Sequence, residues 1–134
     1  MTAMQAKNAA EAYLASSIEN APPAKIVRML YEGAIRFLMQ AEEQDPTASG
    51  NRFAELVGRA DDIVVELRLC LSEDEAPELS ANLRRLYLFC EDELSRALVE
   101  RDASILPAVR SVLMTLLEAW REVEAGASEP SLGV

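Results

Sequence analysis

The chain has 134 residues, half of them apolar, and 13 basic against 23 acidic side chains give a formal net charge of −10. This length suits one domain with a real hydrophobic core, and the shortage of aromatic residues and glycine favours helices over strands. The acidic balance argues against a nucleic-acid partner or an anionic membrane, because both need a basic surface. No apolar run reaches the ~20 residues of a membrane span, and the N-terminus lacks a signal-peptide pattern, so we expect a cytoplasmic protein.

The reactive side chains that most enzymes need are scarce. The chain has no histidine and two cysteines, Cys70 and Cys90, both in apolar helical segments. Without histidine, Ser-His-Asp and Cys-His catalysis and most catalytic zinc sites are excluded, and nothing activates either thiol. We expect two reduced, buried cysteines and a protein that is not an enzyme, with no cofactor and no metal site.

The first 43 residues divide at a pair of prolines. Residues 1–20 are rich in alanine and weakly patterned, so we expect a loosely ordered N-terminal segment, mobile or docked as a cap. Pro22 and Pro23 then introduce a helix over 24–43, whose apolar positions cover about half its circumference. Such a wide arc predicts burial on more than one side. Gly33 inside this helix indicates close packing against a neighbour.

A second helix is predicted over 53–71, after a turn that contains Pro46 and Gly50. Asn51 is one of the candidates to cap it. Besides one strong apolar face, it carries a second, shallower strip about 100–160° away. That strip consists of Ala54, Gly58, Val65 and Leu69.

A third helix is predicted over 78–100, and it holds five consecutive apolar residues at 86–90. A helix turns about 100° per residue, so one core cannot cover all five. Measured from Leu83, the two residues Leu88 and Phe89 lie more than about 100° from the inward face. The residues expected to face the core are Leu79, Leu83, Leu86, Tyr87, Cys90, Leu94 and Ala97.

The fourth helix has a clean apolar stripe from Ile105 to Val123, with Asp102 or Ser104 as its cap. After Glu124 the pattern fades, and we expect residues 125–134 to form a disordered tail. Four amphipathic helices with short connections predict an all-α fold, an antiparallel four-helix bundle (up-down-up-down) over 21–124.

The strongest functional signal is apolar surface beyond what such a core needs. It consists of Val65, Leu69, Leu88 and Phe89, with the small residues Ala54 and Gly58. Exposed apolar patches often bind partner proteins, and the seam between two helices can take an amphipathic helix. The N-terminal segment or a dimer contact could equally cover this surface, and periodicity alone leaves these readings open.

Several stretches together resemble the family of the flagellar secretion chaperone FliS. The first helix, 25–38, resembles that family's Met-Leu-Tyr-Asp-Gly-Ala stretch, and 79–87 resembles its Ile-Ala-x-Asn-Leu-x-x-Leu-Tyr stretch. The chain departs from the family pattern at three positions. The family usually has Ser at the position of Pro22, Asp at that of Leu88 and Tyr at that of Phe89. The other matching residues are Tyr13, Ile18, Pro23, Asp102, Val109, Leu113, Ala119 and Trp120.

The resemblance implies a cytoplasmic, non-catalytic helical bundle that binds the C-terminal region of flagellin, prevents premature polymerisation and assists export. It implies that Tyr13 and Ile18 act as a displaceable cap, and that the flagellar export apparatus or a co-chaperone is a further partner. We expect Asn82 to contact client backbone and the protein to be a monomer or weak homodimer. The expected client-binding residues are Tyr13, Ile18, Val65, Leu69, Asn82, Leu88 and Phe89. The alternative is a self-associating helical adaptor or regulator without a flagellin client.

Overall fold

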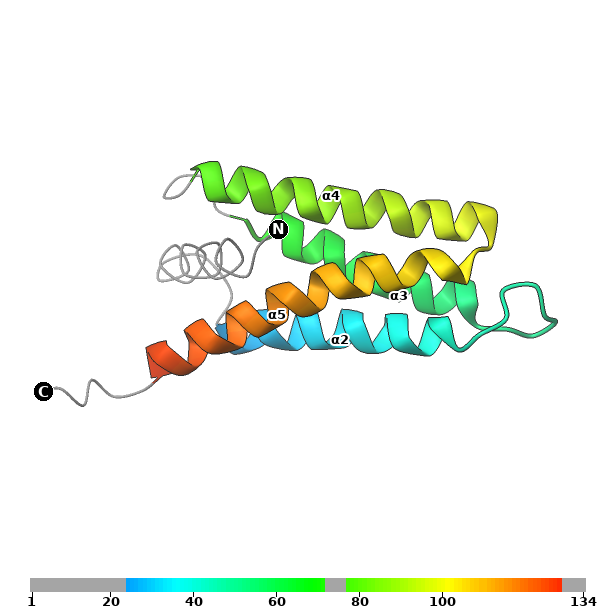
Figure 1. The fold of residues 1–134 in the computed structure, drawn as a ribbon, viewed down its shortest axis with the longest axis horizontal. Helices are drawn as coiled ribbons and strands as arrows, with labels where there is room; N and C mark the ends of the chain where they lie inside the picture. The colour runs from blue at the N-terminus through cyan, green and yellow to red at the C-terminus, as the bar shows by residue number, and fades with distance from the viewer. Residues whose placement is uncertain (1–23, 72–76, 129–134) are drawn as a thin grey trace, which may run out of the picture.

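The computed structural model describes residues 24–71 and 77–128, and within them the chain forms four long helices and no strand. Helices that are adjacent in chain order pack against each other, and the first of the four packs against the last, in one elongated bundle (Figure 1). This arrangement confirms the predicted all-α four-helix bundle. The elements are α2 (Ala24–Glu42), α3 (Phe53–Leu69), α4 (Pro77–Glu100), the short 3-10 helix η1 (Ala103–Ile105) and α5 (Leu106–Ser128).

The inward-facing side chains of the four long helices together form the hydrophobic core. Its polar centre is a hydrogen bond between the hydroxyls of Tyr31 on α2 and Tyr87 on α4. Burial raises the pKa of Tyr31 to about 12, so this hydroxyl stays protonated. The Tyr31 ring also packs against Trp120, with 6.4 Å between ring centroids. Other fully buried side chains include Val27, Leu38, Leu56, Val64, Leu67, Leu94, Leu106 and Leu113.

Ion pairs fix the seam between α2 and α5. They join residues far apart in sequence, and as the residue number rises along α2 it falls by nearly the same amount along α5, as expected for two antiparallel helices. The pairs are Arg28 with Glu124 (3.0 Å), Glu32 with Arg121 (2.8 Å) and Glu42 with Arg110 (2.6 Å). At the same seam the indole N–H of Trp120 donates to the backbone carbonyl of Ala24 at 3.1 Å, which ties the start of α2 to α5.

Local sequence features explain where the helices approach and begin. A Cβ added at Gly33 would lie 3.4 Å from Cδ1 of Ile63, which agrees with the predicted close packing of α2 against a neighbour, here α3. The side chain of Asn51 accepts a hydrogen bond from the N–H of Phe53 at 2.9 Å at the start of α3. The side chain of Asp102 likewise accepts a hydrogen bond from the N–H of Ser104 at 3.0 Å, at the start of η1.

Three expectations about helix ends and the burial of leucines were wrong. Helix α3 ends at Leu69, not at residue 71, because the N–H of Leu71 bonds to Arg68 in a tighter i→i−3 turn. Helix α5 continues to Ser128, so residues 125–128 of the expected tail are helical. Alanine favours helix there, and the Glu124 ion pair anchors the preceding turn.

The third correction concerns Leu79 and Leu86, which are half-buried rather than in the core. They lie on the flank of α4 that faces away from α3. Toward this end of α4, helix α5 leans away from α4 and toward α2 (Figure 1). The two side chains therefore have less of α5 to pack against than an evenly spaced bundle would provide.

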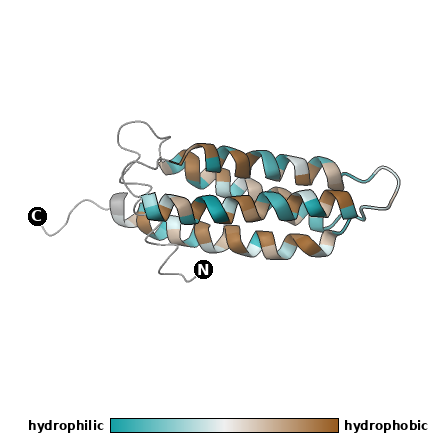
Figure 2. Ribbon diagram, turned by 90° about the horizontal axis from the view of Figure 1, so that it is seen from above, coloured by the Kyte–Doolittle hydropathy of each residue, from teal (hydrophilic) through white to brown (hydrophobic). Residues whose placement is uncertain are grey.

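Hydropathy along the helices fits an amphipathic bundle, with hydrophilic and hydrophobic positions alternating on each helix (Figure 2). One segment, Ala103–Gly126, is long and apolar enough to cross a membrane by length and composition alone. However, 44% of its most apolar window is buried inside the bundle, and core helices of soluble proteins pass the same test. We therefore assign this segment to the core.

Candidate functional site

The five apolar residues at 86–90 divide between core and surface. Tyr87 and Cys90 are buried, whereas Leu88 and Phe89 remain 40% and 44% exposed. The prediction that the latter two lie outside the core is confirmed. The other large apolar side chains that the structure leaves exposed are Ile26, Met29, Met39, Leu69, Val99 and Met114.

Leu88 and Phe89 lie on different flanks of α4. Glu91 marks the flank that faces α3, since its carboxylate accepts two hydrogen bonds from Arg68 at 2.7 and 3.1 Å. At 100° per residue, Leu88 is about 60° from Glu91, while Phe89 is about 160° from it. Leu88 therefore borders α3, and Phe89 lies toward the α5 side. The structure does not bring these two candidates into one site.

Leu88 instead shares a face with the shallow apolar strip of α3. On α3, Val65 lies about 60° from Arg68 and is half-buried, while Leu69 lies about 40° beyond Val65 toward solvent and is 67% exposed. Ala54 is exposed, and a Cβ added at Gly58 would meet no atom within 4 Å. We call this surface the α3/α4 strip: Ala54, Gly58, Val65 and Leu69 on α3 with Leu88 on α4.

The remaining predicted site residues fall elsewhere. Asn82 is exposed, and its side-chain oxygen accepts a hydrogen bond from Arg85 at 3.1 Å. It is seven residues from Phe89, and so on the same flank of α4. Tyr13 and Ile18 lie outside the described residues. The structure thus groups Val65, Leu69 and Leu88, and separately Asn82 with Phe89.

A carboxylate oxygen without a hydrogen-bond partner lies beside the α3/α4 strip. Oδ1 of Asp61 is buried and has no hydrogen-bond partner in the part of the chain that the structure describes. Burial raises the pKa of Asp61, the negative charges of Glu91 and Asp62 raise it further, and the positive charge of Arg68 offsets part of the rise. Buried polar atoms without partners are rare in folded proteins. This one costs stability at the contact between α3 and α4.

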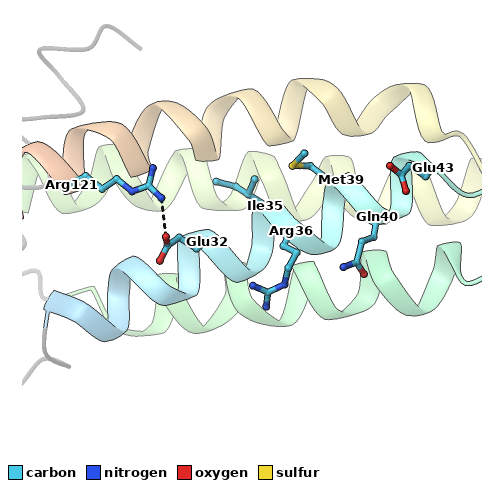
Figure 3. A pocket seen from close by; sticks show the side chains of 7 residues that line it. All are labelled: Glu32, Ile35, Arg36, Met39, Gln40, Glu43 and Arg121. Carbon is cyan, nitrogen blue, oxygen red and sulfur yellow. Dashed lines mark hydrogen bonds and ion pairs between the residues drawn. The ribbon is translucent and has the colours of Figure 1, made fainter.

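Sequence reasoning missed two hollows, since each is formed by side chains far apart in the sequence. The first, about 420 Å³, lies between α2 and α5, where the Glu32–Arg121 pair sits at one end and Met39 lies along its side (Figure 3). The exposed Met39, outside the predicted apolar arc, was the available signal. The second hollow, about 320 Å³, is lined by Pro46, Thr47, Ala48, Asn51, Phe53, Ala54, Leu98 and Arg101.

The described residues offer surfaces for binding rather than groups for reaction. Burial raises the pKa of the Cys90 thiol to about 12, and the charges of Glu91 and Glu93 add to the shift, so its thiolate is inaccessible. Cys70 is half-buried, not buried as expected. Among residues 24–71 and 77–128, no three Cys, Asp or Glu side chains are placed to hold a metal ion.

Comparison with known proteins points to one family. The family model "Flagellar protein FliS" matches residues 6–127. The flagellar secretion chaperone FliS of Vibrio cholerae is 32% identical over 108 residues, which cover 81% of this chain and 79% of the relative. The FliS of Salmonella typhimurium is 28% identical over 95% of both chains, and that of Bacillus subtilis is 27% identical over 89% and 88%.

Proposed function

The chain belongs to the FliS family of flagellar secretion chaperones, and on this premise we propose that its client is the C-terminal region of flagellin. The chaperone binds this region in the cytoplasm, prevents premature polymerisation and assists its export for filament assembly. The observation that carries the proposal is the α3/α4 strip, apolar surface that the core does not use. The flagellar export apparatus or a co-chaperone is a further partner, and the free protein is a monomer or weak homodimer.

The physical requirement for such a client supports the strip as its site. A segment that is disordered when free pays an ordering entropy on binding, so it needs extensive apolar contact. Leu69 and Leu88 offer that contact from two helices on one face of the bundle. Phe89 and Asn82 lie on the outer flank of α4, where a client that wraps round this helix would reach them.

The N-terminal cap belongs to the same proposal. The indole N–H of Trp120 binds the carbonyl of Ala24, and the segment that carries Tyr13 and Ile18 joins the bundle there, at the start of α2. In an antiparallel bundle that is also the end where α3 finishes, at Leu69. A segment starting there is within reach of the strip, and we propose that it covers the strip until the client displaces it.

A substitution that introduces a charged side chain on the α3/α4 strip tests whether the strip binds the client. Leu88 is 40% exposed, so client binding would bury two-fifths of its side chain, and Leu88→Asp removes that apolar contact, worth about 1 kcal/mol. The substitution also buries a new carboxylate, at a cost of about 1–3 kcal/mol. We expect at least about thirtyfold weaker binding of a flagellin C-terminal fragment in isothermal titration calorimetry. Met114→Asp is the matched control, because Met114 is 41% exposed against 40% for Leu88 but lies on α5.

Circular dichroism should show that both variants remain helical. Equal affinity for Leu88→Asp and the wild type would show that the strip is not the client site. A concentration-dependent dimer that ignores the fragment would favour a self-associating adaptor instead.

A further inference from the structure

The α3/α4 strip runs into the second hollow. Ala54 belongs to both, and beside it Phe53 and Leu98 extend the lining on α3 and α4. The turn 46–51 forms the far wall, which Asn51 braces by donating from its side-chain amide to the carbonyls of Pro46 and Ala48. A segment lying along the strip from the Leu69 end would therefore stop or turn at this hollow.

Arg101 is the charged residue of this lining. Its side chain is exposed, and among the described residues it has no ion pair or hydrogen bond. Other exposed arginines have partners of several kinds. Arg52 and Arg96 hydrogen-bond to Glu55 and Glu93, Arg85 hydrogen-bonds to Asn82, and the Arg36 guanidinium lies 5.6 Å from the centroid of the Phe37 ring. The hollow therefore presents a positive charge with its hydrogen-bond donors free.

The backbone of Arg101 gives a second, independent observation. Its φ is 52°, the left-handed conformation that glycine adopts without strain. The N–H of Asp102 bonds to the carbonyl of Ala97 at 3.1 Å, so Arg101 occupies the C′ position of a Schellman motif that ends α4. Glycine is the usual residue at this position. An arginine here carries a backbone cost, which points to a use for its side chain.

We propose that Arg101 binds the α-carboxylate at the C-terminal end of the client chain, with the hollow holding the last residue. This inference rests on the proposed function, because a C-terminal client region carries a free carboxylate by definition. A guanidinium matches a carboxylate with two parallel N–H···O bonds. The apolar walls of Phe53, Ala54 and Leu98 suit the terminal side chain.

The experiment compares flagellin C-terminal fragments with a free acid end and with an amidated end. The wild type should bind the free acid about threefold to tenfold more tightly than the amide, because the pair is charge-assisted but solvent-exposed. This preference should shrink at high salt. Arg101→Gly should bind both fragments equally while its thermal midpoint rises, since glycine relieves the backbone cost.

Two further variants separate a local pair from general charge effects. Arg101→Lys should keep part of the preference, and Arg36→Ala, which removes the same charge from α2, should keep all of it. Equal binding of acid and amide by the wild type would overturn the proposal, as would a preference that survives Arg101→Gly. Weaker binding of both fragments to Arg101→Gly, without any acid preference in the wild type, would assign Arg101 to an acidic side chain and also overturn it.

The outcome is distinguishable from failure of the proposed function. If Leu88→Asp weakens binding while acid and amide bind alike, the client site stands and only the role of Arg101 is refuted. If the wild type binds neither fragment, both proposals fail.

Discussion

Replacing Asp61 by asparagine should make the protein more stable at neutral pH. Oδ1 of Asp61 is buried beside Glu91 without a partner among the described residues, and Arg68 is already engaged by Glu91. Asp61→Asn preserves the shape of the side chain and removes the charge. The contact between α3 and α4 then loses a carboxylate that burial and two neighbouring acids disfavour.

The magnitude follows from the cost of an unsatisfied buried polar atom, about 1–3 kcal/mol. The amide still lacks one partner, so we expect a gain of about 1 kcal/mol in the free energy of unfolding at pH 7. The pKa of Asp61 is raised in the folded protein, so its favourable contribution is complete below the unfolded pKa and is lost as pH rises through the folded pKa. The advantage of asparagine is therefore largest at neutral pH and disappears in acid.

Urea denaturation of wild type and Asp61→Asn at pH 7 and near pH 3.5 measures both expectations. Asp62→Asn is the matched control, because it removes the same charge from the adjacent, exposed position. That control should change the midpoint much less. A less stable Asp61→Asn protein at pH 7, or a gain that is the same at both pH values, would refute the reasoning.

Two smaller predictions concern thiols and glycines. Native protein at pH 8 should react with one equivalent of a thiol reagent, at half-buried Cys70. Cys90 should react only after unfolding, because it is 0% exposed and its pKa is about 12. Rapid reaction of two equivalents with the native protein would contradict this. In chemical denaturation, Gly58→Ala should add about 0.5–1 kcal/mol to the free energy of unfolding. Gly33→Ala should add less, because the new Cβ at residue 33 would lie 3.4 Å from Ile63. Equal gains for the two variants would contradict the close contact between Gly33 and Ile63.

Helical periodicity predicted those features that depend on one helix at a time. The starts of the helices and the exposure of Leu88 and Phe89 follow from turn chemistry and a 100° rotation per residue. The burial of Leu79 and Leu86 does not, because it depends on how far α5 leans away from α4. Periodicity also separates Leu88 from Phe89 by 100°, but it does not say which neighbouring helix each one borders.

The features beside the strip needed three dimensions. The missing partner of Asp61 becomes visible only when Glu91 and Arg68 are placed around it. The hollow at Arg101 combines the turn 46–51 with the end of α4, segments about fifty residues apart. Even the left-handed backbone at Arg101 gives no signal in a sequence, because arginine is not the residue that such a position favours.

The hydrogen bond from Trp120 to Ala24 also provides an optical reporter. Trp120 is the only tryptophan in the chain, 2% exposed, with Tyr31 beside it as an energy donor. Its indole contacts the residue at which the N-terminal segment joins the bundle. Its fluorescence should therefore follow that junction rather than the α3/α4 strip. Emission spectra recorded during a flagellin titration would then time the release of the N-terminal segment against client binding, without an attached dye.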